Sequence, residues 1–194
     1  SGSGTDLISV ARAQQAEQLA DVDSSLLAVL ITAASRAIVA WCGREFVSQT
    51  FSETYDGDGT RRLHLRQFPV TSLTSVTITD TDGTEYDIAT TAFRVDGVAG
   101  IIEFKPDAAD DFTWFPEGFQ NVTVVYVAGY ASVPEDVQQA CALTVAAMAA
   151  DDKVDPRMSA ETLGSYSYTR ASADGVLPQA AKALLAAYRV VRIA

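Results

Sequence analysis

The chain has 194 residues, 48% of them hydrophobic, enough for a sizeable buried core in one domain or in one domain with an appendage. Its formal net charge of −11 argues against a nucleic-acid groove, because such a groove needs clustered Lys and Arg to displace counterions. No uninterrupted apolar run approaches the roughly 20 residues of a membrane span and no secretory signal is visible, so we expect a soluble protein with no membrane partner. Cys42 and Cys141 lack the spacing of metal ligands and are expected to be free, buried thiols.

The first part of the chain is expected to be helical. Residues 1–5 begin with Ser-Gly-Ser-Gly and are expected to be a flexible leader outside the fold. The segment 6–20 predicts a short amphipathic helix. The segment 23–43 predicts the central helix of the core, because Asp23 or Ser24 can cap its start and Gly43 can end it. Its apolar stripe is wide, which predicts neighbours on more than one side.

Residues 49–128 change from a helical to an alternating pattern and predict a β insertion. The clearest strands are Thr74–Thr79 and Asn121–Val127. Asp82-Gly83 predicts a hairpin, since the favoured tight turns need positive φ. A second glycine-bearing turn is expected at Gly97–Gly100.

The last part of the chain returns to helix. Residues 133–150 predict a helix that starts around Pro134, with acidic residues in its first turn. Residues 151–176 predict an extended linker. Pro178–Ile193 predicts a final helix that either folds back on the core or becomes ordered on a partner. Helices 6–43 and 133–150 would thus flank the β insertion, forming a core over 6–150 with 151–194 appended. This order predicts an α+β fold with a small helical bundle and an antiparallel β-rich insertion.

No constellation of residues indicates catalysis, a cofactor or a metal site. His64 is the only histidine, and its alternating position predicts a solvent-facing strand residue. The acidic segment Asp80–Asp87 lacks the register of a calcium loop and is expected to be a polar hairpin tip. Paired carboxylates for sugar hydrolysis stay open in so acidic a chain, although nothing singles out a pair. Trp114, Phe115 and Phe119 lie in an irregular loop and are expected either to plug the sheet or to form a binding surface.

Short strings of residues, spread over nearly the whole chain, occur in a fixed order. They are Asp6-Leu7-Ile8-Ser9, Trp41-Cys42-Gly43-Arg44-Glu45-Phe46, Tyr55-Asp56-Gly57, Leu63-His64-Leu65, Phe68-Pro69-Val70-Thr71-Ser72-Leu73-Thr74-Ser75-Val76, Val125-Tyr126-Val127-Ala128-Gly129-Tyr130, Val133-Pro134-Glu135-Asp136-Val137 and Glu161-Thr162-Leu163-Gly164-Ser165-Tyr166-Ser167-Tyr168. In this order they resemble head–tail connector (adaptor) proteins of tailed bacteriophages and gene-transfer particles.

The resemblance implies a structural role without enzymatic activity. Adaptors of this kind form a ring, typically dodecameric, beneath the portal protein and offer a platform to a neck, stopper or tail protein. The implied partners are therefore the portal, a neck or tail protein and further copies of the chain, with genome DNA passing through without specific binding. The implied location is the head–tail interface of a virion, assembled in the cytoplasm of a bacterial host.

The C-terminal residues 151–194 are the expected portal-docking part, because the final helix is basic and has an apolar stripe. The candidates are Leu163, Tyr166, Tyr168, Leu184, Leu185, Tyr188, Arg189 and Arg192.

Two questions stay open on the sequence alone. Contacts within the ring could use the helix Leu26–Trp41 or the rim of the sheet. The alternative functions are another neck or tail protein, such as a stopper or tail-completion protein, and a carbohydrate-binding or hydrolase domain.

Overall fold

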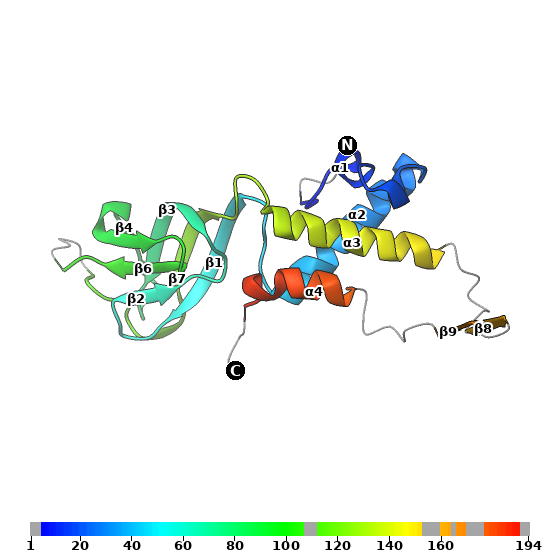
Figure 1. Ribbon diagram of the computed structural model, residues 1–194. Coiled ribbons are helices and arrows are strands. Elements are labelled where there is room, and N and C mark those ends of the chain that lie inside the picture. The colour runs from blue at the N-terminus through cyan, green and yellow to red at the C-terminus, as the bar shows by residue number, and fades with distance from the viewer. Residues whose placement is uncertain (1–4, 107–111, 153–159, 164–165, 170–176, 191–194) are drawn as a thin grey trace. The chain divides into compact units, whose positions relative to one another are not determined.

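A computed structural model of the chain describes residues 5–106, 112–152, 160–163, 166–169 and 177–190. The chain folds into two compact units (Figure 1). The helical unit takes residues 1–43 and 133–194, and the β unit takes residues 44–132. Helices and antiparallel strands are both present, so the predicted α+β fold is confirmed.

The helical unit is built around α2 (Ser24–Cys42). The Asp23 carboxylate caps its start by accepting hydrogen bonds from the backbone N–H groups of Ser25 and Leu26, at 2.9 and 3.2 Å. Gly43 ends it in the left-handed conformation, with φ of 71°. The predicted central helix therefore forms between the predicted caps. Its buried face consists of Leu27, Ile31, Ala34, Ser35, Ile38 and Cys42.

Two further helices pack side by side in this unit: α3 (Glu135–Asp152) contacts both α2 and α4 (Gln179–Leu185). The chain then continues into a 3-10 turn, η3 (Ala186–Tyr188). Leu177, Ala181 and Leu185 are buried. Of the two expectations for the final helix, the structure shows the one in which it folds back onto the helical unit.

Two expectations for this unit need correction. Residues 6–20 do not form one helix, but a short α1 (Val10–Ala13) and a 3-10 turn, η1 (Glu17–Leu19). The residues just before α1 are not helical; Leu7 is buried there and its N–H donates to Ser35 Oγ, at 3.0 Å. The segment expected as a linker contains a hairpin, β8 (Ala160–Leu163) with β9 (Tyr166–Thr169).

The β unit contains two antiparallel sheets. The larger sheet has the order β1-β7-β3-β4, and the smaller has the order β2-β6-β5. The predicted hairpins are present, one between β3 and β4 around Gly83 and one between β5 and β6 around Gly97–Gly100. The elements are β1 (Gln49–Gly57), β2 (Arg62–His64), β3 (Val70–Thr79), β4 (Glu85–Ile88), η2 (Thr90–Ala92), β5 (Phe93–Asp96), β6 (Ile101–Phe104) and β7 (Gly118–Ala128).

Both sheets of the β unit contribute to one hydrophobic core. Phe93 and Phe104 of the smaller sheet gather around Phe115, with ring centroids 4.5 to 5.9 Å apart. Val76 and Val124 of the larger sheet, both fully buried, belong to the same core. Burial of this many large apolar side chains is the main stabilising contribution in the unit.

Candidate assembly surfaces

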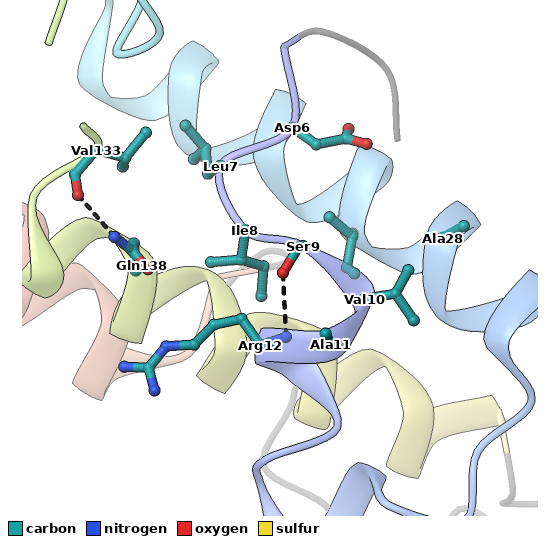
Figure 2. Close-up of a pocket in the computed structure, with 11 residues that line it drawn as sticks. Asp6, Leu7, Ile8, Ser9, Val10, Ala11, Arg12, Ala28, Val133 and Gln138 are labelled. Carbon is teal, nitrogen blue, oxygen red and sulfur yellow. Dashed lines mark hydrogen bonds between the residues drawn. The ribbon is translucent and has the colours of Figure 1, made fainter. Parts of the chain in front are cut away.

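A groove runs along the N-terminal segment of the helical unit (Figure 2). Its volume is about 600 Å³, within the range of about 300 to 1,000 Å³ that is usual for binding pockets. This N-terminal groove is lined by Asp6, Leu7, Ile8, Ser9, Val10, Ala11, Arg12, Ala28, Ile31, Val133 and Gln138.

The polar groups along the N-terminal groove form hydrogen bonds within the helical unit. Thr32 Oγ1 donates to Asp6 Oδ1 at 3.0 Å, and the Ser9 hydroxyl accepts from the N–H of Arg12 at 3.1 Å. The Arg12 guanidinium forms an ion pair with Glu135 at 3.1 Å. Because most of the remaining lining is aliphatic, the groove is suited to apolar side chains rather than to a charged substrate.

A second surface lies on α2 itself. Leu26, Val29, Ala33, Arg36 and Ala40 recur at steps of three and four residues and are all exposed; we call this row the outer face of α2. Val29 is 66% exposed and Leu26 is 38% exposed. The sequence predicted neighbours on more than one side of the helix, and the described residues supply none that bury Val29. Because its exposed apolar residues recur on one face of the helix, this row is a candidate contact surface.

The composition of α2 is unusual for a helix so exposed. By length and hydropathy it is the one helix of the described residues that is apolar enough to cross a membrane, although only 33% of that window is buried in the molecule. Core helices of soluble proteins pass the same test, so this is weak evidence for a membrane. It does show that the apolar surface of α2 exceeds what the described part of the unit covers.

The C-terminal candidate residues divide into two groups. Leu163, Tyr166 and Tyr168 lie on the hairpin β8–β9, where Leu163 pairs with Tyr166. In the final helical segment, Leu184 and Tyr188 are partly buried, Leu185 is fully buried and Arg189 is exposed, whereas Arg192 lies outside the described residues. The structure thus brings the second group onto the helical unit.

The end of this segment crosses the C-terminus of α2. The N–H of Val190 donates to the carbonyl oxygen of Cys42 at 2.8 Å, satisfying one of the acceptors that the end of a helix leaves free. The Arg189 guanidinium lies 5.2 Å from the centroid of the Trp41 ring, and its positive charge is favourable near a helix C-terminus. These contacts fasten the C-terminal segment to α2.

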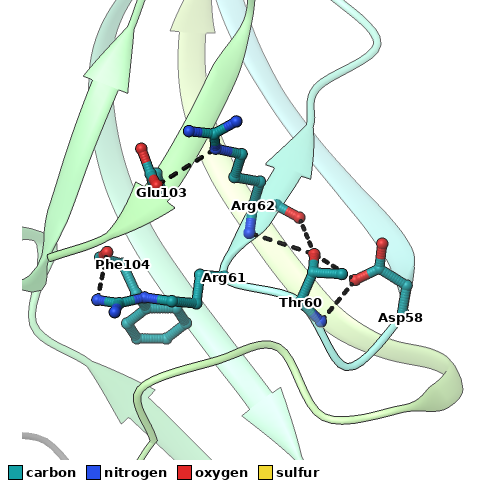
Figure 3. A network of polar contacts seen from close by, with 6 residues as sticks. All are labelled: Asp58, Thr60, Arg61, Arg62, Glu103 and Phe104. Atoms are coloured by element: carbon teal, nitrogen blue, oxygen red, sulfur yellow. Dashed lines mark hydrogen bonds and ion pairs between the residues drawn. The ribbon is translucent and has the colours of Figure 1, made fainter. Parts of the chain in front are cut away.

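The polar network of Figure 3 ties the β1–β2 loop to the smaller sheet. Arg62 pairs with Glu103 across strands at 3.2 Å, and the Arg61 guanidinium donates to the carbonyl oxygen of Phe104 at 2.9 Å. Asp58 accepts hydrogen bonds from the Thr60 hydroxyl and N–H, which hold the pKa of Asp58 below its ordinary value. These groups bind one another, so we assign them a structural role.

A second polar cluster, which the sequence did not reveal, joins β1 to β7. The hydroxyls of Tyr55 and Tyr126 both donate to Glu53 Oε2, and the latter bond is 2.5 Å long. Burial and the bond to Glu53 raise the pKa of Tyr55 to about 12, and the same causes raise the pKa of Tyr126. The alternating pattern predicts that Glu53 and Tyr55 lie on the same face of one strand. A single sequence does not show that Tyr126, 71 residues after Tyr55, is their partner.

The remaining chemical candidates lie on different elements of the β unit. His64 is exposed on β2, as expected. The Asp80–Asp87 segment forms the β3–β4 hairpin, where Asp82 accepts a hydrogen bond from the N–H of Thr84 that lowers the pKa of Asp82. Among the described residues no three His, Cys, Asp or Glu side chains gather in a way that would hold a metal ion.

The loop aromatics divide between the two expected roles. Phe115 is fully buried and plugs the β-unit core. Trp114 and Phe119 are 52% and 82% exposed.

The β unit carries a formal charge of −8, because residues 44–132 contain fourteen Asp and Glu against six Lys and Arg. Its surface is therefore strongly acidic, with isolated apolar side chains.

Comparison with known proteins gives a family and a set of similar folds. Residues 6–191 match the family model of the head completion protein. Three similar solved structures share the fold at 20 to 21% sequence identity. They are the "Neck of empty GTA particle computed with C6 symmetry" (TM-score 0.64, covering 100% of this chain and 94% of that one), the "Neck of native GTA particle computed with C12 symmetry" (0.60, 97% and 96%) and the "Virion of native gene transfer agent (GTA) particle" (0.63, 100% and 94%). No curated protein matches the chain.

The family match and the similar solved structures together support a structural protein of the head–tail neck. The family match covers nearly all of the chain, and the chain belongs to the head completion protein family. The resemblance drawn from the sequence strings is thereby confirmed.

Proposed function

We propose that the chain is a head–tail adaptor that forms a ring beneath the portal of a phage-like capsid and provides the platform for the next neck or tail protein. The observation that carries this proposal is the fold match with neck subunits, which extends over 100% of this chain and 94% of the other. The neck structures were computed with C6 and C12 symmetry, which supports a ring of this chain's copies, twelve being the expected number.

The charge of the β unit supports passage of DNA without binding. A formal charge of −8 on residues 44–132 repels phosphates that come within about a Debye length, about 10 Å at 0.1 M salt. A basic surface would instead release counterions and hold the genome in place. Assembly takes place in the host cytoplasm before the particle is complete, and the mature chain lies at the head–tail interface.

The portal contact is assigned to the C-terminal part of the chain. The hairpin with Leu163, Tyr166 and Tyr168 follows α3 and precedes α4 in the sequence, and tyrosine is a residue type suited to a contact surface that is partly apolar and partly wet. The other contributors are Leu184, Tyr188, Arg189 and Arg192. Leu185 is fully buried, so its part is to hold the final helix on the helical unit.

Co-purification with the portal protein of the same particle tests the proposal. Truncation after Asp151 is unsuitable, because it would remove Leu177, Ala181 and Leu185 from the buried core. Residues 160–169 are instead replaced by a Gly/Ser segment of the same length, which leaves α4 in place. A matched control carries Ala186→Ser, an exposed change at the end of α4.

We expect the intact chain and the Ala186→Ser control to be retained on assembled portal, and the hairpin-replaced chain to be lost. Retention of all three proteins on portal would support the adaptor role and indicate that the portal contact lies on the helices rather than on the hairpin. Failure of the intact chain to bind assembled portal would overturn the proposal. Binding to tail tube in its place would identify a stopper or tail-completion protein.

A further inference from the structure

The two apolar surfaces of the helical unit lie on nearly opposite sides of α2. Successive residues of an α-helix are turned by about 100° around its axis. Ala28 and Ile31 therefore point toward the N-terminal groove, which they line, while Leu26 and Val29 point to the other side. One helix thus presents a protruding apolar row on one side and one wall of an apolar hollow on the other.

We propose that the outer face of α2 in one copy of the chain enters the N-terminal groove of the next copy, with Leu26 and Val29 as the inserted side chains. The inference rests on the ring proposed above and names the contact that closes it. A cyclic ring of more than two copies needs a heterologous interface, in which two different patches of the same subunit meet. The two sides of α2 provide such a pair.

Charge supports a second copy as the occupant. Arg36 is the only charged residue within α2, and it lies on the outer face. Among the described residues it has no ion-pair partner. The groove that would receive this face has two charged lining residues, the Asp6 carboxylate and Arg12, and the Arg12 guanidinium is already paired with Glu135. A cation at one patch and a carboxylate at the other favour head-to-tail contact over the pairing of two identical faces, which would bring two Arg36 side chains together.

Size and composition fit as well. The groove has a volume of about 600 Å³, enough for a Leu and a Val from one helix turn. Leu7 and Ile8 in its lining are themselves buried, so it has a firm apolar floor. An inserted Val29, now 66% exposed, would be removed from water there, which is the usual source of affinity in an interface core.

Cysteine pairs test the orientation of the contact. Val29→Cys marks the outer face and Ala11→Cys marks the exposed rim of the groove. The native Cys42 and Cys141 are buried, which limits their reaction with a short bis-maleimide cross-linker. The chain without added cysteines, treated in the same way, measures the residual cross-linking through these two thiols. Each variant is bound to assembled portal, cross-linked and separated under denaturing conditions. The control pair combines Ala11→Cys with Val98→Cys, which lies on an exposed turn of the β unit.

The chain carrying both Val29→Cys and Ala11→Cys is expected to give a ladder of oligomers, with loss of most of the monomer band. Mixing the two single variants should give dimers and no ladder, because each copy then has one reactive patch. Cross-linking of Val29→Cys to itself, or no ladder from rings that are retained on portal, would overturn the inference while leaving the adaptor role intact. Absence of retention on portal would overturn both.

Discussion

The β unit gathers large side chains from both of its sheets into one core, whereas the helical unit has a helix, α2, with apolar residues on both its buried and its exposed face. In the β unit the rings of Phe93, Phe104 and Phe115 form one cluster, and both sheets close over it. In the helical unit α2 buries Leu27 and Ile31 but exposes Val29. Single large apolar side chains, such as Trp114 and Phe119, are exposed in the β unit too, but the helical unit exposes apolar residues in a regular row along one helix, which suits contact with a partner.

The largest expected effect is on the core of the β unit. Phe104→Ala should lower the free energy of unfolding by about 3–5 kcal/mol, because it removes a fully buried ring and leaves a cavity. Guanidinium unfolding followed by fluorescence measures it. Trp41 lies in the helical unit and Trp114 in the β unit, so Trp41→Phe leaves a reporter of the β unit alone.

The matched control for that change is Val98→Ala, at a position that is 83% exposed, where we expect a change within about 0.5 kcal/mol. A small effect of Phe104→Ala would mean that the aromatic cluster is loosely packed and that the contrast between the units does not hold.

The next effect concerns close packing of the β-unit backbone. Gly129 has φ of 110°, and a Cβ there would lie 2.6 Å from the carbonyl oxygen of Val47. Gly129→Ala should therefore lower the free energy of unfolding by about 2–5 kcal/mol, combining backbone strain with a steric clash. Gly83→Ala also has positive φ but meets nothing within 4 Å, and should cost about 1–2 kcal/mol. Equal effects of the two substitutions in the same unfolding assay would contradict the close contact.

Much of this contrast could be predicted from the sequence. Local signals were sufficient for α2, since Asp23 and Gly43 cap it as their chemistry requires, and for the hairpin at Asp82-Gly83. The prediction of one helix at residues 6–20 was wrong, because burial of Leu7 and its hydrogen bond to Ser35 outweigh the helical preference that the periodicity indicated. That contact joins residues 28 positions apart, and a periodicity argument does not detect it.

The candidate surfaces were predictable only in part. The apolar width of α2 indicated contacts on several sides, but which side stays exposed depends on where α3 packs. The N-terminal groove depends on Val133 and Gln138, which are distant in sequence from the segment that they help to enclose. The sequence placed Leu184, Leu185 and Tyr188 on one face, and only the fold distinguishes buried Leu185 from its neighbours.

A smaller effect should appear in alkaline solution. The pKa of Tyr55 is raised to about 12 and that of Tyr126 is also raised, so the folded β unit favours the neutral phenols. Their contribution to stability is complete below the ordinary pKa of 10 and is lost as the pH rises toward 12. We expect the unfolding midpoint of the β unit to fall over this range, as read from Trp114. Tyr55→Phe with Tyr126→Phe should reduce that fall, and an unchanged pH profile would refute this origin.

The smallest expected effect on stability is the most informative about the helical unit. Val29→Ser should change the free energy of unfolding by less than about 0.5 kcal/mol, because the side chain is 66% exposed and the two residues have similar helix propensities. Unfolding followed by Trp41 in a Trp114→Phe background measures this. Assembly on portal should nevertheless weaken, since a hydroxyl would replace an apolar group in the proposed contact. A loss of stability well above 1 kcal/mol would show that the chain itself covers Val29, and the outer face of α2 would then not be available to a second copy.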